Sequence, residues 1–305
     1  MGAPSDDLEP RSFPGGAALV GPGRAWVLVE HEPVRSLGPA LAWARRAGAA
    51  GLSLVVEATG GALARRAAAF ADPVPEVWSV VGRELERAEP EPLPPVAPLD
   101  PQLELWAPVL REAGCDVVAE FGRLVGEVLG LEVARVVVDG GAPKLEVGVG
   151  RFDREAHAEL AGAGEPTPQT LRRVVAQVRD QRRPGAPATP LARLSPERRL
   201  RSLLVAEPSL VGAQRLRPVA PMTDVPLRRP APAAAVGVTP DGAPVVVVAS
   251  TGIDLDLVPT AADVRAREAP AARLTLAVPR RDASPVTRDL AGALRDAAEV
   301  VEVDR

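Results

Sequence analysis

Residues 25–46 read AWVLVEHEPVRSLGPALAWARR, and residues 245–266 read VVVVASTGIDLDLVPTAADVRA. The two stretches align without a gap at an offset of 220 residues. Four aligned positions carry identical residues, namely Leu37 and Leu257, Pro39 and Pro259, Ala42 and Ala262, and Arg45 and Arg265. Self-similarity at a fixed offset is the sequence signature of a repeated structural unit. The chain is therefore predicted to contain one supersecondary unit twice, once near each end.

Each copy is expected to fold in the order β-β-α-β-α-β. The elements expected in the N-terminal copy are strands at 17–20 and 25–30, a helix at 36–47, a strand at 52–58, a helix at 62–71 and a strand at 76–81. Those expected in the C-terminal copy are strands at 234–238 and 245–249, a helix at 256–267, a strand at 274–278, a helix at 285–297 and a strand at 299–303. Strands joined by helices of this length predict parallel pairing. The apolar run AWVLVE at 25–30 is typical of a strand that is covered on both faces.

The chain between the copies changes character twice, first to a Pro- and acid-rich linker and then to short glycine-separated strands and helices. The predicted organisation is a disordered N-terminus at 1–16, a first α/β repeat at 17–81, a linker at 82–100, a helix and β-meander domain at 101–165, a basic helical and Pro-rich connector at 166–230, and a second α/β repeat at 231–305. Helices are expected at 151–161, 167–183 and 196–206. The fold class is α/β in the wider α+β sense, and the two repeats are expected to pack about a pseudo-two-fold axis.

Composition indicates a globular bacterial protein. Hydrophobic residues make up 46% of the 305 residues, which is enough for sizeable cores. Of the 36 basic residues only Lys144 is a lysine, which together with the many Ala, Gly and Pro residues indicates a high-GC genome. The single cysteine, Cys115, excludes an internal disulfide and is typical of a reducing cytoplasm. No apolar run approaches the roughly 18 residues of a membrane span, so we expect a cytoplasmic protein with no membrane contact.

Positive charge is concentrated in one segment. Residues 172–229 contain thirteen arginines and four acidic residues, a net charge of +9, although the whole chain carries −4. A basic stretch of this kind is typical of a nucleic-acid surface, or of a solvated segment that balances acidic domains. The nucleic-acid hypothesis names eight contact residues: Arg172, Arg173, Arg179, Arg182, Arg183, Arg198, Arg199 and Arg201.

The C-terminal hairpin and helix, TPDGAPVVVVASTGIDLDLVPTAADVRA at 239–266, have the order of a known nuclease core. Over about 70 residues each copy resembles part of the restriction-endonuclease-like PD-(D/E)XK superfamily. That family ends its second strand in Glu-x-Lys, where this chain has Ala249-Ser250-Thr251 in one copy and Glu30-His31-Glu32 in the other. The resemblance therefore implies a nuclease-like fold with a degenerate catalytic motif.

Carboxylates offer two alternative metal sites. If the strands at 131–139 and 144–150 pair, Glu132 and Glu146 are expected to converge with Lys144 between them, a set suited to Mg²⁺ or Mn²⁺ and phosphate chemistry. Glu30 and Glu32 flank His31 just after a strand end, where α/β sheets often bind ligands. In both places, solvent-exposed surface residues are the simpler interpretation.

Three functional hypotheses follow. The first is a nuclease-like, catalytically degenerate protein that binds nucleic acid or a protein partner. The second is a metal-dependent hydrolase that uses Glu132, Glu146 and Lys144. The third is a structural or assembly protein whose repeats mediate homo-oligomerisation. The sequence alone leaves open whether the protein is an enzyme.

Overall fold

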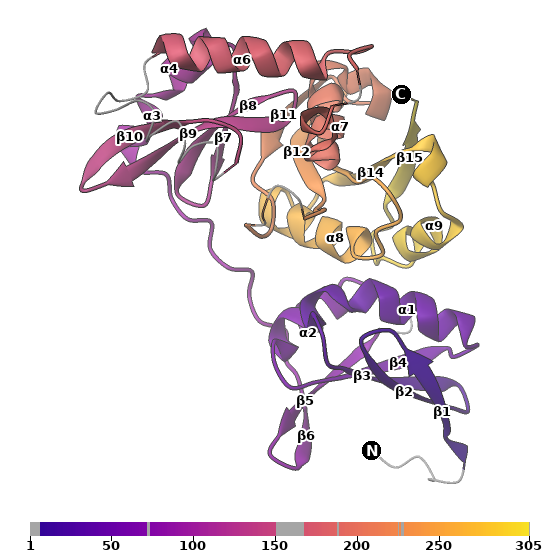
Figure 1. The fold of residues 1–305 in the computed structure, drawn as a ribbon. Coiled ribbons are helices and arrows are strands. Elements are labelled where there is room, and N and C mark those ends of the chain that lie inside the picture. The colour runs from indigo at the N-terminus through magenta and orange to yellow at the C-terminus, as the bar shows by residue number, and fades with distance from the viewer. Residues whose placement is uncertain are drawn as a thin grey trace. The chain divides into compact units, whose positions relative to one another are not determined.

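The computed structural model describes residues 7–71, 74–150, 168–187, 189–224, 226 and 229–304 (Figure 1). The fold is α+β, as predicted. The chain forms two compact units, which we call unit 1 (Met1–Pro94 and Gly252–Arg305) and unit 2 (Pro95–Thr251). Among the described residues, no helix is long and apolar enough to cross a membrane.

The N-terminal copy has the predicted element order with an extra strand at each end. Its elements are β1 (Glu9–Phe13), β2 (Gly16–Gly21), β3 (Arg24–Val29), α1 (Leu37–Arg46), β4 (Gly51–Val56), α2 (Gly60–Ala67), β5 (Glu76–Val81) and β6 (Glu84–Arg87), with a 3-10 turn at Pro33–Arg35. They build one six-stranded sheet in the order β1-β2-β3-β4-β5-β6. The crossovers make β3, β4 and β5 parallel, and the remaining neighbours are antiparallel.

Two segments of this copy correct the predicted boundaries. Strand β1 lies inside the segment predicted as disordered, and β6 lies inside the predicted linker. Both are short edge strands whose side chains are mostly exposed, so they lack the apolar alternation by which strands are recognised. Strand β1 is fixed instead by Phe13, which is buried edge-to-face against Trp43 of α1.

Helices α1 and α2 cover one face of this sheet (Figure 1). Alternate residues of β3, including Ala25 and Val27, point to that side and are fully buried, as are Leu37 of α1 and Leu63 of α2. Trp26 and Leu28 alternate with them and remain partly exposed on the opposite face. The prediction that both faces of β3 are covered is therefore wrong. Within the described part of unit 1, no helix lies over this second face.

The C-terminal copy also has the predicted order and gains a preceding strand. It consists of β11 (Arg215–Val219), β12 (Ala233–Val238) and β13 (Pro244–Ala249) in unit 2, followed by α8 (Leu257–Glu268), β14 (Arg273–Pro279), α9 (Pro285–Gly292) and β15 (Glu299–Val303) in unit 1, with a 3-10 turn at Arg280–Asp282. Helices α1 and α8 begin at the aligned residues Leu37 and Leu257. Strands β11, β12 and β13 are antiparallel, and β14 and β15 are parallel.

The helices of the two copies contact one another inside unit 1 through equivalent pairs. Helix α1 contacts α8, and the α2–α8 contact has its symmetry mate in the α1–α9 contact. Phe70 and Leu294, which follow α2 and α9, form an isolated antiparallel bridge. Two reciprocal hydrogen bonds flank this bridge: Ala71 N donates to Ala293 O at 2.7 Å, and Arg295 N donates to Ala69 O at 2.9 Å. Reciprocal contacts of this kind are what an isologous arrangement requires, and the pseudo-two-fold axis stays a prediction.

Unit 2 is built on the predicted meander. Its remaining elements are α3 (Pro101–Glu104), α4 (Ala107–Glu112), β7 (Asp116–Glu120), β8 (Arg123–Val128), β9 (Leu131–Asp139), β10 (Ala142–Val147), α6 (Pro168–Arg182) and α7 (Pro196–Ala206), with 3-10 turns at Leu191–Arg193 and Pro208–Val211. The four strands form an antiparallel sheet in the order β10-β9-β8-β7. Helices α4 and α6 lie on one face of it (Figure 1) and bury Leu110, Leu171 and Val175.

Described helices of the segment predicted as a connector at 166–230 pack against the sheets of unit 2, which corrects that prediction. Helix α6 buries its apolar stripe against the sheet, and α7 contacts β11, β12 and β13. An amphipathic helix with arginines on one side has the sequence pattern of a solvated connector. The sequence alone does not reveal its packing when the surface it contacts lies far away along the chain. The helix predicted at 151–161 lies outside the described residues.

Candidate functional site

The eight arginines of the proposed nucleic-acid surface fall into two groups. Four of them are buried or partly buried and donate to other groups of unit 2: Arg182, Arg198, Arg199 and Arg201. Arg182 is fully buried and donates to the backbone oxygens of Leu191, Leu194 and Leu129. The other four, Arg172, Arg173, Arg179 and Arg183, are exposed on or just after α6.

Arg198 and Arg201 of α7 form a buried charge cluster with Glu120 and Glu127. Arg198 donates to both oxygens of Glu120 at 2.9 Å and to Glu127 at 2.5 Å. Arg201 donates to the second oxygen of Glu127. Both carboxylates are 1% exposed and Arg201 is 2% exposed. These arginines therefore neutralise carboxylates of the meander rather than presenting a free cationic surface.

Burial governs the protonation of this cluster. Desolvation raises the pKa of Glu120, against the opposing effect of Arg198. Burial also raises the pKa of neighbouring Asp116, and the charge of Glu127 adds to the effect. Burial disfavours the charge of Arg198, yet Glu127 and Glu120 together raise the pKa of its guanidinium. The arginine therefore stays charged and holds its carboxylate partners in place.

The predicted Glu132, Glu146 and Lys144 set has a different arrangement from the expected one. Strands β9 and β10 pair with Glu146 opposite Arg135 and with Lys144 opposite Val137, so Lys144 does not lie between the two glutamates. Glu146 accepts from Arg135 Nε at 2.6 Å, and Lys144 donates to Asp139 at 2.9 Å.

A register shift also changes the face on which Glu132 lies. Strands β8 and β9 shift by one residue between Gly126 and Glu127, which places Glu132 directly opposite Glu127. Strict alternation would group Glu132 with Ala134 and Val136, but a one-residue bulge moves every residue beyond it to the other face.

Glu30 and Glu32 are both exposed beyond the end of β3. Glu32 has a left-handed backbone at φ 45°, and the backbone N–H groups of Glu30 and His31 donate to Gly15 O. In the described part of the chain, no group of three or more His, Cys, Asp or Glu side chains is arranged to hold a metal ion.

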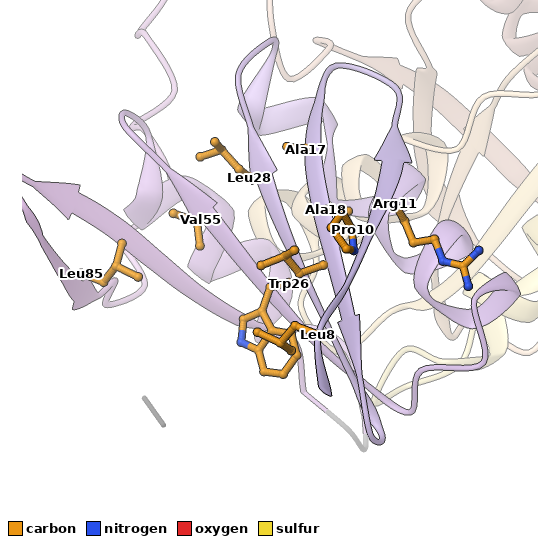
Figure 2. A pocket seen from close by; sticks show the side chains of 10 residues that line it. Leu8, Pro10, Arg11, Ala17, Ala18, Trp26, Leu28, Val55 and Leu85 are labelled. Carbon is orange, nitrogen blue, oxygen red and sulfur yellow. The ribbon is translucent and has the colours of Figure 1, made fainter. Parts of the chain in front are cut away.

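A groove lies on the face of the N-terminal sheet that α1 and α2 leave uncovered (Figure 2). We call it the Trp26 groove. Its volume is about 590 Å³. Apolar side chains from five strands and the residue before β1 line most of it: Leu8, Pro10, Leu19, Trp26, Leu28, Val55 and Leu85. Arg11 is the charged residue of the lining. The groove lies over β1, β2 and β3 and extends towards β4 and β6.

The register of the strands explains why these side chains gather. Leu19 pairs with Trp26, and Leu28 pairs with Val55, so they occupy adjacent positions on one face. Leu19 and Leu85 are 38% and 42% exposed, which is high for leucines within a sheet. A folded protein that leaves such residues together on one face has an apolar surface available for binding.

Polar groups close one end of this face. Arg24 donates to Glu76 at 2.6 Å and to Ser53 at 2.9 Å, on three adjacent strands. At the β1 edge, Arg11 donates to Glu9 at 2.6 Å. An apolar centre with a charged rim is the usual anatomy of a protein–protein interface.

Comparison with known proteins adds no relative. No family model, no curated protein and no solved structure matches this chain. The fold and the groove are therefore the basis for a functional assignment.

Proposed function

We propose that this protein is a non-catalytic binding protein that holds a protein partner on the Trp26 groove. The observation that carries the proposal is the apolar lining of this groove on a sheet face that no described helix of unit 1 covers. The degenerate strand ends support the same view, since neither copy has the Glu-x-Lys of the nuclease family that it resembles. The buried thiol of Cys115 supports a reducing cytoplasm as the location.

A protein partner fits the groove better than a nucleic acid does. Nucleic-acid sites combine phosphate-binding cations with aromatic stacking surfaces. The Trp26 groove has Arg11 as its charged residue and is otherwise lined mainly by aliphatic side chains. Aliphatic side chains with a central tryptophan are typical anchors for apolar side chains of another protein.

Site-specific photocrosslinking in the native cytoplasm tests this proposal. A photoreactive residue at Leu28 is expected to capture a defined protein that an identical probe at Val138 does not capture. Val138 is a suitable control because it is an exposed apolar residue on β9 of unit 2. Purified wild-type protein in excess should compete for the captured species, and the Leu28→Asp variant should not. Equal capture at both positions, or equal competition by the variant, would refute the proposal.

Nucleic-acid binding is a second candidate because of the exposed side of α6. Arg172 and Arg173 lie there, opposite the buried Leu171 and Val175. Phosphate contacts by these arginines predict binding that weakens steeply with salt. Fluorescence anisotropy with labelled single-stranded DNA and RNA should show binding at low salt that Arg172→Glu with Arg173→Glu abolishes. No binding at low salt, or binding that is independent of salt, would remove this candidate.

A further inference from the structure

The C-terminal copy provides an internal comparison for the Trp26 groove. Strands β11, β12 and β13 are antiparallel neighbours in that order, as β1, β2 and β3 are in the N-terminal copy. The gapless alignment of residues 25–46 with 245–266 makes Val246 and Val248 the equivalents of Trp26 and Leu28. The same sheet face therefore occurs twice in the chain, with different side chains.

The two faces differ in what covers them. Val246 and Val248 are 0% exposed, whereas Trp26 and Leu28 are partly exposed. In unit 2, helix α7 contacts β11, β12 and β13 and buries Leu200 and Leu204 completely. We infer that α7 covers the Val246 face. The groove of the N-terminal copy lies over the three equivalent strands (Figure 2).

We propose that the Trp26 groove is the docking site for an amphipathic helix of a partner protein, in the position that α7 takes in the C-terminal copy. This inference rests on the proposed function, and it names the kind of partner. The helix must present two apolar side chains four residues apart, as α7 does with Leu200 and Leu204, because this spacing places both on one side of a helix. The larger Trp26 and Leu28 then contact the partner's apolar side chains where α7 meets valines.

The dimensions agree with this assignment. Helix α7 has 11 residues, and a helix of this length spans about 16 Å. Three neighbouring strands spaced by about 4.8 Å present a surface that one such helix can cross. An extended peptide would add to the edge of β1 through its backbone and leave the face open, so the apolar lining of the groove favours a helix.

The α7 sequence itself provides a probe. A labelled peptide of residues 195–207 (SPERRLRSLLVAE) is titrated with the full-length chain and followed by fluorescence anisotropy, with a Leu200→Asp, Leu204→Asp peptide as the matched control. We expect the wild-type peptide to bind and the control peptide not to bind. Leu28→Asp in the protein should weaken binding by about 30-fold or more, the typical effect of losing an anchor residue, and Val138→Asp should leave it unchanged. Circular dichroism verifies that Leu28→Asp is folded, and Leu19→Lys replaces it if it is not.

Each other outcome overturns a defined part of the argument. Peptide binding that is unaffected by the groove variants overturns the helix assignment. The helix assignment is also overturned if the peptide does not bind and the protein self-associates through a contact that Leu28→Asp abolishes. The groove would then still bind protein, with a second copy of this chain as the occupant. A third outcome is that a fatty acid such as myristate binds and Leu28→Asp loses this binding, while the protein shows neither peptide binding nor self-association. This outcome overturns the proposed protein-binding function as well.

Discussion

The buried charge cluster makes a quantitative prediction for Glu127→Ala. Glu127 accepts from Arg201 through one oxygen and from Arg198 at 2.5 Å through the other. Its removal leaves Arg201, which is 2% exposed, without its carboxylate partner. Arg198 keeps Glu120, to which it donates twice at 2.9 Å. The main penalty is therefore one uncompensated buried guanidinium.

The expected loss is about 3–5 kcal/mol of unfolding free energy, the usual cost of breaking a buried ion pair from one side. A domain of ordinary stability has only about 5–15 kcal/mol in total. Unit 2 should therefore lose a large fraction of its stability. Its melting temperature should fall by about 6–20 °C, since 1 kcal/mol corresponds to about 2–4 °C in a domain of this size.

Hydrogen exchange measured by mass spectrometry on the full-length chain can report on unit 2 separately. Peptides covering β8 and α7 should exchange roughly 10²–10⁴ times faster in Glu127→Ala, because every 1.4 kcal/mol changes the opening equilibrium tenfold. Peptides from β3 and α1 provide an internal reference. Adding Arg201→Met should restore part of the protection, because the uncompensated charge is then removed.

The matched control is Asp139→Ala on the same sheet. Asp139 accepts from Lys144 at 2.9 Å, but these side chains are 62% and 49% exposed. Exposed pairs contribute about 0–1 kcal/mol, so little change in exchange is expected. The reasoning is refuted if Glu127→Ala costs no more than Asp139→Ala, since Arg201 would then not depend on Glu127 for its charge compensation.

Three further predictions concern other buried groups. Burial raises the pKa of Asp256 from 3.8 to about 6, so its contribution to the stability of unit 1 is full below pH 4 and is lost as the pH rises through 6. Denaturant titration should therefore show that the unfolding free energy of wild type falls relative to that of Asp256→Asn between pH 4 and 7, by up to about 3 kcal/mol. A difference that does not change with pH would contradict this. Burial raises the pKa of Cys115 to about 12, so iodoacetamide at pH 8 should label it only in denaturant; rapid labelling of the native protein would be the contrary result. Gly38→Ala should destabilise unit 1 by about 1–3 kcal/mol through overpacking, because its Cβ would lie 1.8 Å from Leu255 O. Gly292→Ala, with no atom within 4 Å of its Cβ, is the matched control and should stabilise unit 1 by up to about 1 kcal/mol. Thermal unfolding measures both glycine variants.

The order of the repeated elements was predictable because it depends on local patterns. Apolar runs separated by helices of regular length identify the strands of each copy, and the aligned Leu37 and Leu257 mark the start of α1 and α8. Strands β1 and β6 were not predictable in this way. Their residues are held by ladder hydrogen bonds to a neighbouring strand, which depend on the partner rather than on the alternation of the strand itself.

The candidate site was less predictable than the fold. Whether Trp26 and Leu28 are covered depends on a helix that comes from elsewhere in the sequence. The apolar run at 25–30 therefore cannot show whether the strand has one open face or is buried on both faces. The bulge that places Glu132 opposite Glu127 also cannot be predicted from the alternation of residues in one strand, because it is a property of the pair of strands. The predictions for the faces of β3 and for Glu132 were both wrong because they depend on contacts with residues far away in the sequence.

The charge distribution has an internal explanation once the long-range pairs are considered. Arg198 lies 78 residues from Glu120 and 71 residues from Glu127, so a count along the sequence separates cations from the anions that they neutralise. The net charge of 172–229 therefore overstates the charge available to a ligand. The same helix that supplies these arginines, α7, also buries Leu200 and Leu204 and contacts the C-terminal copy's strands β11, β12 and β13. One duplicated face is therefore covered by α7, whereas no helix in the described part of unit 1 covers the other. This asymmetry is the basis for the proposal that a partner's helix docks on the Trp26 groove.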